Sequence, residues 1–410
     1  MNRSPLLAPF TVRSFRFQFP ADLLTSWAQE AEIVILGWYV LTKTDSVLLL
    51  AVYGGLQYLG TLISPIIGLG GDRFGHRNVL VAMRTTYWML SGLLTVLAYA
   101  DALDAVLVFL IAGIAGLIRP SDLATRNALV AETMPSDRLM AAMGVARTTS
   151  DSARIFGALA GVTMVATMGF ANAYVGVTIF YIVGFALTLG IRIAVRPERI
   201  GRLSFWRDMT EGLRFIADTP QSLAGMWLAF LVNLTAFPMT HGLLPYVAKE
   251  VYRIGQTGLG TLVASFAFGG LIGCILVGLL GRRLQPGRMT MVFAVGWYVL
   301  VLAFVWMPDA NWGRAMLVLA GLSQSLSMVP LSTMLLHSAG VRFRGRVMGV
   351  RMLAIYGLPL GLVIAGWSIE RIGFVATSTT YCCIGLVATA YIWVRWYGAL
   401  WPASAPANAR

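Results

Sequence analysis

The chain has 410 residues, of which 58% are hydrophobic and only 12% are charged, and its mean hydropathy is +0.74. Soluble domains carry about 25% charged residues, so this composition excludes an ordinary soluble protein. The net charge of +13 could suggest nucleic acid, but the basic residues are scattered between apolar stretches long enough to span a bilayer. We expect a lipid bilayer, and no nucleic acid, as a partner.

Twelve apolar runs follow one another along the chain, each long enough to cross a membrane as a helix. They lie at 22–43, 48–70, 79–99, 103–130, 139–166, 171–192, 221–247, 257–280, 288–307, 313–337, 346–368 and 374–396. The N-terminus lacks the short apolar core and cleavage site of a signal peptide, so the first run is expected to remain as the signal. These runs predict an all-α membrane protein of twelve transmembrane helices.

The longest stretch between two runs, 193–220, divides the helices six and six. It mixes arginines with Phe205 and Trp206, which is typical of an amphipathic segment at the membrane interface. We expect an N-terminal six-helix bundle over 1–192, a cytoplasmic linker over 193–220, and a C-terminal bundle with a short cytoplasmic tail over 221–410.

A weak internal repeat supports two pseudo-symmetric bundles. Residues 143–145 (Met-Gly-Val) recur 205 positions later at 348–350, and Ala-Gly at 160–161 recurs at 365–366. Transporters built from repeats bind substrate near the membrane midplane between them. The predicted topology places twenty arginines in cytoplasmic segments and five basic residues outside, which predicts two cytoplasmic termini in a bacterial inner membrane.

A dense charge cluster separates the second and third runs. The sequence GLGGDRFGHR at 68–77 resembles the signature loop of the major facilitator superfamily, although His76 stands where that family usually has arginine. Asp72 can face the positive end of a helix from the other half, with the helix beginning near Arg346 as the expected partner. An ordinary basic turn is the alternative. The residues expected to form the gating loop are Gly68, Asp72, Arg73, Gly75 and Arg77.

Three further stretches narrow the resemblance. Residues 204–220, 344–366 and 154–161 are similar to the drug- and siderophore-exporting branch that includes macrolide and enterobactin exporters, although Ala158 replaces a proline of that branch. The resemblance implies export of a small molecule. We also expect a monomer that needs no cofactor.

Ionisable residues within membrane helices are costly and therefore indicate function. The candidates for proton coupling are Glu30, Glu32, Asp122 and Asp151. The triads Arg119, Asp122, Arg126 and Arg147, Asp151, Arg154 have mirrored spacing, which predicts Asp–Arg contacts between two antiparallel helices. A purely structural network is the alternative interpretation.

The remaining candidates could bind substrate or extend the charge network. They are Gln29, Arg119, Arg126, Arg147, Arg154, Asn233, Phe237, Gln324, Arg351 and Tyr356. The three histidines are too dispersed to predict a metal site. No nucleotide-binding loop of the GxxxxGK[ST] kind occurs, which argues against direct use of ATP.

These observations predict a secondary transporter rather than an enzyme. The expected activity is proton-coupled efflux of an amphipathic small molecule by alternating access, with protons entering at Glu30 or Glu32. One alternative is an importer or facilitator of an organic anion, which the arginines would bind. A polytopic membrane enzyme is a more distant alternative, because no cluster of His, Ser or Cys with acidic partners is visible.

Overall fold

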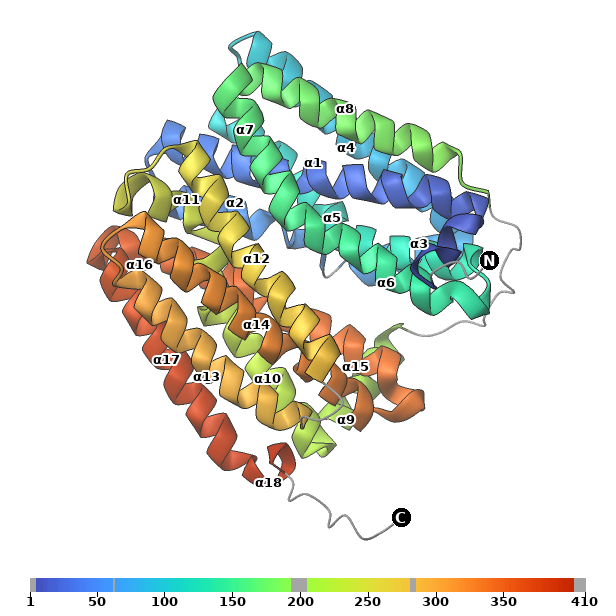
Figure 1. The fold of residues 1–410 in the computed structure, drawn as a ribbon, viewed down its shortest axis with the longest axis vertical. Helices are drawn as coiled ribbons and strands as arrows, with labels where there is room; N and C mark the ends of the chain where they lie inside the picture. Colours follow the sequence, from blue (N-terminus) through green and yellow to red (C-terminus); the bar gives the residue numbers. More distant parts are fainter. Residues whose placement is uncertain (1–4, 62, 193–204, 281–284, 402–410) are drawn as a thin grey trace. The chain divides into compact units, whose positions relative to one another are not determined.

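The computed structural model describes residues 5–61, 63–192, 205–280 and 285–401, and its regular elements are helices (Figure 1). The chain divides into two compact units. The first comprises Met1–Gly201 with Leu244–Ala264, and the second comprises Arg202–Leu243 with Ser265–Arg410. The segment Leu244–Ala264 thus groups with the first unit, whereas the sequence alone placed it in the C-terminal bundle.

The first unit is built around one long helix, α1, which packs against α5, α7 and α8. Its helices are η1 (Pro5–Thr11), α1 (Arg13–Thr44), α2 (Val47–Leu56), η2 (Leu59–Thr61), α3 (Ser64–Phe74), α4 (His76–Tyr99), α5 (Ala105–Thr133), α6 (Ser136–Ser152), η3 (Ala153–Gly157), α7 (Ala158–Met168), α8 (Phe170–Leu189), α11 (Leu244–Tyr246) and η5 (Val247–Val251). An ion pair between Lys249 and Asp45 joins the last of these to the end of α1.

The second unit has α10 at its centre, in contact with α14, α16 and α17. Its helices are α9 (Phe205–Asp218), α10 (Pro220–Thr235), η4 (Pro238–Gly242), α13 (Pro286–Val305), α14 (Ala310–Ser338), α15 (Gly340–Ala354), α16 (Gly357–Ile372), α17 (Phe374–Arg395) and α18 (Tyr397–Leu400). Helix α12 (Gln256–Leu280) begins in the first unit and continues into the second.

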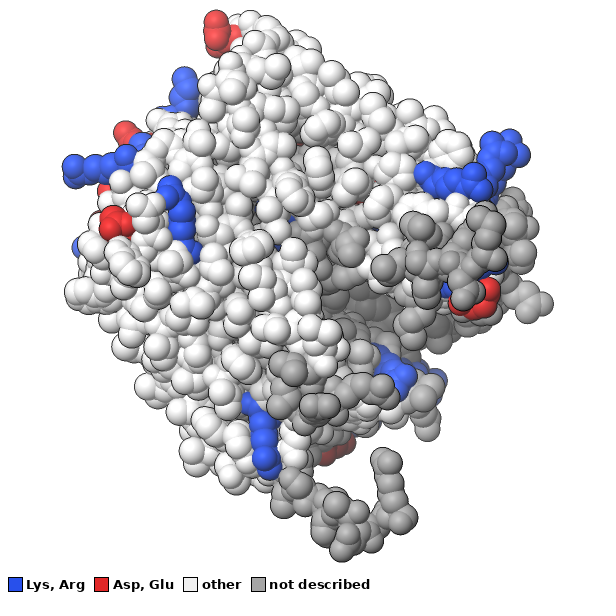
Figure 2. Space-filling model, in the orientation of Figure 1, with Lys and Arg blue, Asp and Glu red and all other residues white. Residues whose placement is uncertain are grey.

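Nine helices in the described ranges are long and apolar enough to cross a membrane. The three other predicted runs also form helix, but each departs from that standard for a visible reason. Helix α1 carries several charged residues, the second run is divided among α2, η2 and α3, and the fifth is divided by the π-helical turn η3. Most of the face in Figure 2 is uncharged, and its few charged side chains lie toward helix ends.

Two 29-residue helices carry the internal repeat clearly. Helix α5 spans Ala105–Thr133 and α14 spans Ala310–Ser338, an offset of 205 residues. Each starts after an aspartate, Asp104 or Asp309, whose side chain accepts a hydrogen bond from a backbone N–H of the first turn and so caps the helix. The matching lengths and caps support duplication of an ancestral bundle.

The same two helices each approach a neighbour through a glycine. A Cβ added at Gly116 would lie 1.9 Å from the carbonyl oxygen of Leu56, and one at Gly321 would lie 2.0 Å from that of Phe266. Any larger side chain would force these backbones apart, as expected where membrane helices pack through small residues. Gly116 and Gly321 are also 205 positions apart, so the close approach is part of the repeat.

Candidate functional site

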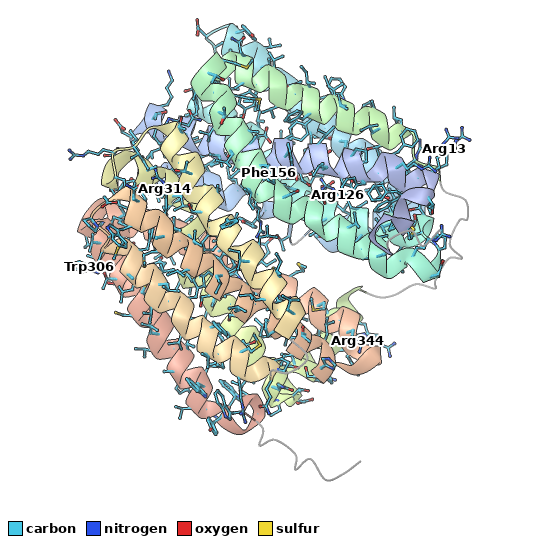
Figure 3. The ribbon with its side chains drawn as sticks, in the orientation of Figure 1. Arg13, Arg126, Phe156, Trp306, Arg314 and Arg344 are labelled. Atoms are coloured by element: carbon cyan, nitrogen blue, oxygen red, sulfur yellow. The ribbon has the colours of Figure 1, made fainter. Side chains whose placement is uncertain are left out.

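Buried ionisable side chains gather in the first unit, where α1 lies among α4, α5 and α8 (Figure 1). In Figure 3, Arg126 lies among these helices, whereas Arg13 extends from the end of α1. Charged groups in a membrane interior are costly unless they are paired. We therefore describe the site by the ion pairs and hydrogen bonds that these buried side chains form.

The first group, which we call the Asp22 cluster, consists of Asp22, Arg84, Asp122 and Arg126. Arg84 of α4 pairs with Asp22 of α1, and its side chain is 0% exposed. Arg126 of α5 pairs with Asp122 one turn earlier, and its Nε lies 3.7 Å from a carboxylate oxygen of Asp22. The two positive and two negative charges sum to zero, so the cluster is neutral when all four groups are ionised.

Hydrogen bonds from polar and backbone groups complete the cluster. Arg84 donates to the carbonyl oxygen of Gly184, at 3.2 Å, and to the Thr188 hydroxyl, both on α8. Arg126 donates to the Ser26 hydroxyl at 2.5 Å and to the backbone oxygen of Asp22 at 3.3 Å. The cluster therefore ties α1, α4, α5 and α8 together.

A second group, the Glu32 cluster, lies farther along α1 and consists of Glu32, Arg119, Tyr181 and Gln57. Oε2 of Glu32 accepts hydrogen bonds from Arg119 and from the Tyr181 hydroxyl, each at 2.9 Å. Arg119 also donates to the Gln57 side chain. A cavity of about 10 Å³ beside these groups is at the lower limit of the space that one water molecule needs.

The two clusters are spaced along α1 and α5 as antiparallel neighbours require. Asp22 and Glu32 are ten residues apart on α1, which corresponds to about 15 Å along a helix axis. Their partners on α5 follow in the opposite order, with Arg126 beside Asp22 and Arg119 beside Glu32. The arrangement is a ladder of carboxylate–guanidinium contacts between α1 and α5.

Glu30 has different surroundings from Glu32. It is partly buried, and the charged groups that act on it electrostatically are Arg154 and Arg119. A Cβ added at Gly157 would lie 3.2 Å from the Glu30 Cβ and 2.8 Å from the carbonyl oxygen of Trp27, so α1 lies close to the π-helical turn η3. This turn directly precedes Ala158, the residue that replaces the exporter branch's proline. Gln29 is also partly buried.

The mirrored triads are only partly described by the structure. Arg126 pairs with Asp122 in its own helix and with Asp22, neither of which the spacing predicted as its partner. The side chains of Arg147 and Asp151 lie outside the described residues, so their contacts with α5 remain a prediction. Arg154 is exposed.

The second unit places its predicted residues in a more apolar setting. Arg351 donates to the Ser332 hydroxyl at 2.6 Å, and the Asn233 amide donates to the Ala229 oxygen of its own helix at 2.8 Å. Phe237 packs edge-on against Trp297 and His241. Gln324 accepts a hydrogen bond from Ser325, and Tyr356 is partly buried.

The predicted gating loop forms the end of α3 and the start of α4. Gly75 joins them with a φ of 88°, a conformation that favours glycine. His76 contacts Glu132 at 2.6 Å, Arg77 donates to the Leu189 oxygen at 2.7 Å, and Arg73 is exposed. The side-chain surroundings of Gly68 and Asp72 lie outside the described residues. The proposed partner of Asp72 stays a prediction.

Sequence reasoning missed four side chains that complete the two clusters. Asp22 sits at the first position of its apolar run, and Arg84 lies singly inside another. The position of Arg84 within a predicted span was a usable signal, because an arginine there needs a partner. Tyr181 and Gln57 gave no such signal, since they are ordinary residues at helix positions. The described residues include no group of three His, Cys, Asp or Glu side chains able to hold a metal.

The chain is similar over most of its length to known efflux proteins. It is 27% identical to the multidrug efflux pump Tap of Mycolicibacterium fortuitum over 378 residues, which are 87% of this chain and 90% of that protein. It is 21% identical to macrolide efflux protein A of Streptococcus pyogenes over 379 residues, which are 89% of this chain and 92% of that protein.

Solved transporters share the fold at low sequence identity. A bacterial homologue of the human lysosomal transporter Spinster has a TM-score of 0.70 at 13% identity, over 94% of this chain and 95% of that one. A D-xylose–proton symporter has a TM-score of 0.68 at 13% identity, over 92% and 96%. Residues 18–359, most of the chain, match the profile of the Major Facilitator Superfamily. The chain is therefore a multi-pass membrane transporter that belongs to the Major Facilitator Superfamily.

Proposed function

We propose that this transporter exports amphipathic small molecules in exchange for protons, by alternating access of its site to the two sides of the membrane. The observation that carries the proposal is the placement of Glu30. This carboxyl group is partly buried on α1, two residues before Glu32, which pairs with Arg119, and it lies in the electrostatic field of Arg154 and Arg119.

Glu30 is better suited than Glu32 to exchange protons. Glu32 forms an ion pair with Arg119 and accepts a hydrogen bond from Tyr181, so protonating it would remove the charge that Arg119 needs as a partner. Glu30 makes no hydrogen bond or ion pair with another residue in the described ranges. We therefore assign proton binding to Glu30 and the positioning of Arg119 to Glu32.

The direction of transport is proposed from the two relatives whose names state efflux. The basic bias of the predicted inner loops supports a plasma-membrane protein with both termini in the cytoplasm. Substrate would bind from the cytoplasm, and proton entry from outside would reset the carrier. The domain boundaries expected from the sequence, with a linker over 193–220, belong to the same proposal.

The alternative of organic-anion import needs arginines able to bind an anion. Of the arginines considered for this role, Arg119 already pairs with Glu32, which weighs against an anion there, whereas Arg154 is exposed and Arg351 donates to the Ser332 hydroxyl. Transport by inverted and right-side-out vesicles distinguishes the two directions.

Reconstituted protein with a macrolide antibiotic as the probe tests the coupling. An imposed pH gradient should drive macrolide accumulation by the wild type. Glu30→Gln should abolish this accumulation but keep exchange of labelled for unlabelled macrolide, because the neutral amide resembles a protonated carboxyl that never releases its proton. Glu32→Gln should lose both activities and melt at a lower temperature.

Glu370→Gln is the matched control, because Glu370 is an exposed glutamate in the second unit. It should behave as the wild type. Normal pH-driven accumulation by Glu30→Gln would show that proton coupling resides elsewhere.

A further inference from the structure

The second unit contains an apolar surface cavity of about 350 Å³, separate from the charged clusters. Its walls come from the linker helix α9, the first turns of α10 and the last turns of α15. The residues that matter below are Leu213, Ala217, Met226, Trp227, Leu353 and Ala354. None of the lining side chains is charged, and Trp227 is 52% exposed. The cavity is therefore open and suited to a hydrocarbon chain.

Helix α9 is held in place by its opposite side, against α15. Glu211 pairs with Arg346 at 2.7 Å, and Phe215 stacks on Phe343 with ring centroids 4.7 Å apart. A Cβ added at Gly212 would lie 3.2 Å from Arg346 and from Val350, so the two helices are in close contact there. This contact leaves Leu213 and Ala217 exposed beside the cavity.

Basic residues outnumber acidic ones on the two helices that flank the cavity. Helices α9 and α15 together carry six arginines and three acidic residues. Arg214 is exposed, follows Leu213, and lies one helical turn from Ala217 and from the exposed Asp218. Within the described residues it has no hydrogen bond or ion pair. An exposed arginine is thus next in the helix to two residues that line the cavity, and an exposed tryptophan lines it too. Arginine and tryptophan together are typical of the boundary between lipid tails and headgroups.

We propose that this cavity binds an anionic phospholipid, with one acyl chain between α9, α10 and α15 and the phosphate at Arg214. Charge complementarity selects an anionic lipid, because basic clusters next to membrane helices attract negatively charged headgroups. The acyl chain would join the linker helix to the span that follows it. The inference goes beyond the proposed export activity and does not depend on it.

The test uses Trp227 as a reporter in nanodiscs that contain the full-length protein. The fluorescence of Trp227 is obtained by subtracting the emission of the Trp227→Phe variant from that of the wild type. Phospholipids with brominated acyl chains quench a tryptophan that they touch. Brominated phosphatidylglycerol should quench Trp227 at about fivefold lower mole fraction than brominated phosphatidylcholine, the preference expected for one arginine at an anionic surface.

Two variants, each also made with Trp227→Phe, separate the headgroup contact from the acyl contact. Arg214→Gln should remove the preference and keep quenching by both lipids. Ala217→Phe should fill the cavity and weaken quenching by both. The matched controls are Arg395→Gln and Ala390→Phe, two exposed positions on α17 in the same unit, and both should keep the wild-type preference. Elution volume and helical circular dichroism establish that each variant is folded.

Equal quenching by the two lipids in the wild type would overturn the proposal, since the cavity would then be an ordinary lipid-facing surface. Protection of Trp227 from quenching by an added macrolide would also overturn it, by assigning the cavity to substrate. Failure of the macrolide transport assay would leave this result unaffected.

Discussion

The Asp22–Arg84 pair offers a stability test of the charge network. Removing one partner of a buried ion pair typically costs about 3–5 kcal/mol, because the other charge remains buried and uncompensated. Arg84 is 0% exposed and Asp22 is 5% exposed, so solvent cannot screen either. Asp22→Asn should be the more damaging change. It leaves Arg84 without its carboxylate, whereas Arg84→Gln leaves Asp22 with the Nε of Arg126 at 3.7 Å.

We expect Asp22→Asn near the upper end of that range and Arg84→Gln near the lower end. The double mutant restores the balance of charge and should recover about 0.5–3 kcal/mol of the summed loss, as contacting residues do. Unfolding of all four proteins in mixed micelles supplies the free energies, and Arg73→Gln serves as an exposed-arginine control. Strict additivity of the two single changes would refute the pairing.

Three further predictions test the gating loop, the close contact of Gly157 with α1, and the ion pair between Lys249 and Asp45. Asp72→Asn should slow transport but leave substrate affinity unchanged, and equal loss of both would contradict a gating role. Gly157→Ala should destabilise the protein by about 1–3 kcal/mol, because its Cβ would meet a backbone oxygen of α1, whereas Gly144→Ala, where nothing lies within 4 Å, should not. The hydrogen bond from Lys249 to Asp45 raises the pKa of Lys249, so the pair stabilises the protein below the lysine's ordinary pKa and loses its effect as the pH rises through the raised value. Asp45→Asn should therefore lower stability by at most about 1 kcal/mol at neutral pH, and a difference that did not shrink as the pH rose beyond the lysine's ordinary pKa would contradict this reasoning.

The fold was predictable because membrane helices are specified locally. A run of about 20 apolar residues forms a spanning helix wherever it lies, so its existence can be recognised without knowing its neighbours. The family resemblance of the loop at 68–77 then indicated how the helices are organised. The exceptions were helices whose polar residues or π-helical turns interrupt the pattern, such as α1 and the segment around Ala153–Gly157.

The site was less predictable because its partners are distant in sequence. Spacing within α5 placed Arg119, Asp122 and Arg126 on one helical face, but the structure divides them between the two clusters, with Arg119 beside Glu32 and Asp122 beside Arg126. Spacing could not show that Arg126 and Arg119 face carboxylates of α1, or that Arg84 of α4 completes the group. Which helix faces which is a tertiary property. A single sequence carries no information on residue pairs that covary between related proteins, so it could not identify these contacts.

The neutrality of the Asp22 cluster also bears on how the protein is made. Asp22 is 62 residues from Arg84 and 104 residues from Arg126, so synthesis produces the carboxylate well before either partner. An unpaired aspartate or arginine opposes insertion by about 2.5–3.5 kcal/mol at the centre of a membrane helix, so the penalty for Asp22, at the start of its apolar run, is smaller. Helix α1 therefore cannot settle in lipid alone without this penalty. The first four spans should leave the insertion machinery as a group, with α1 held beside it until α5 has emerged.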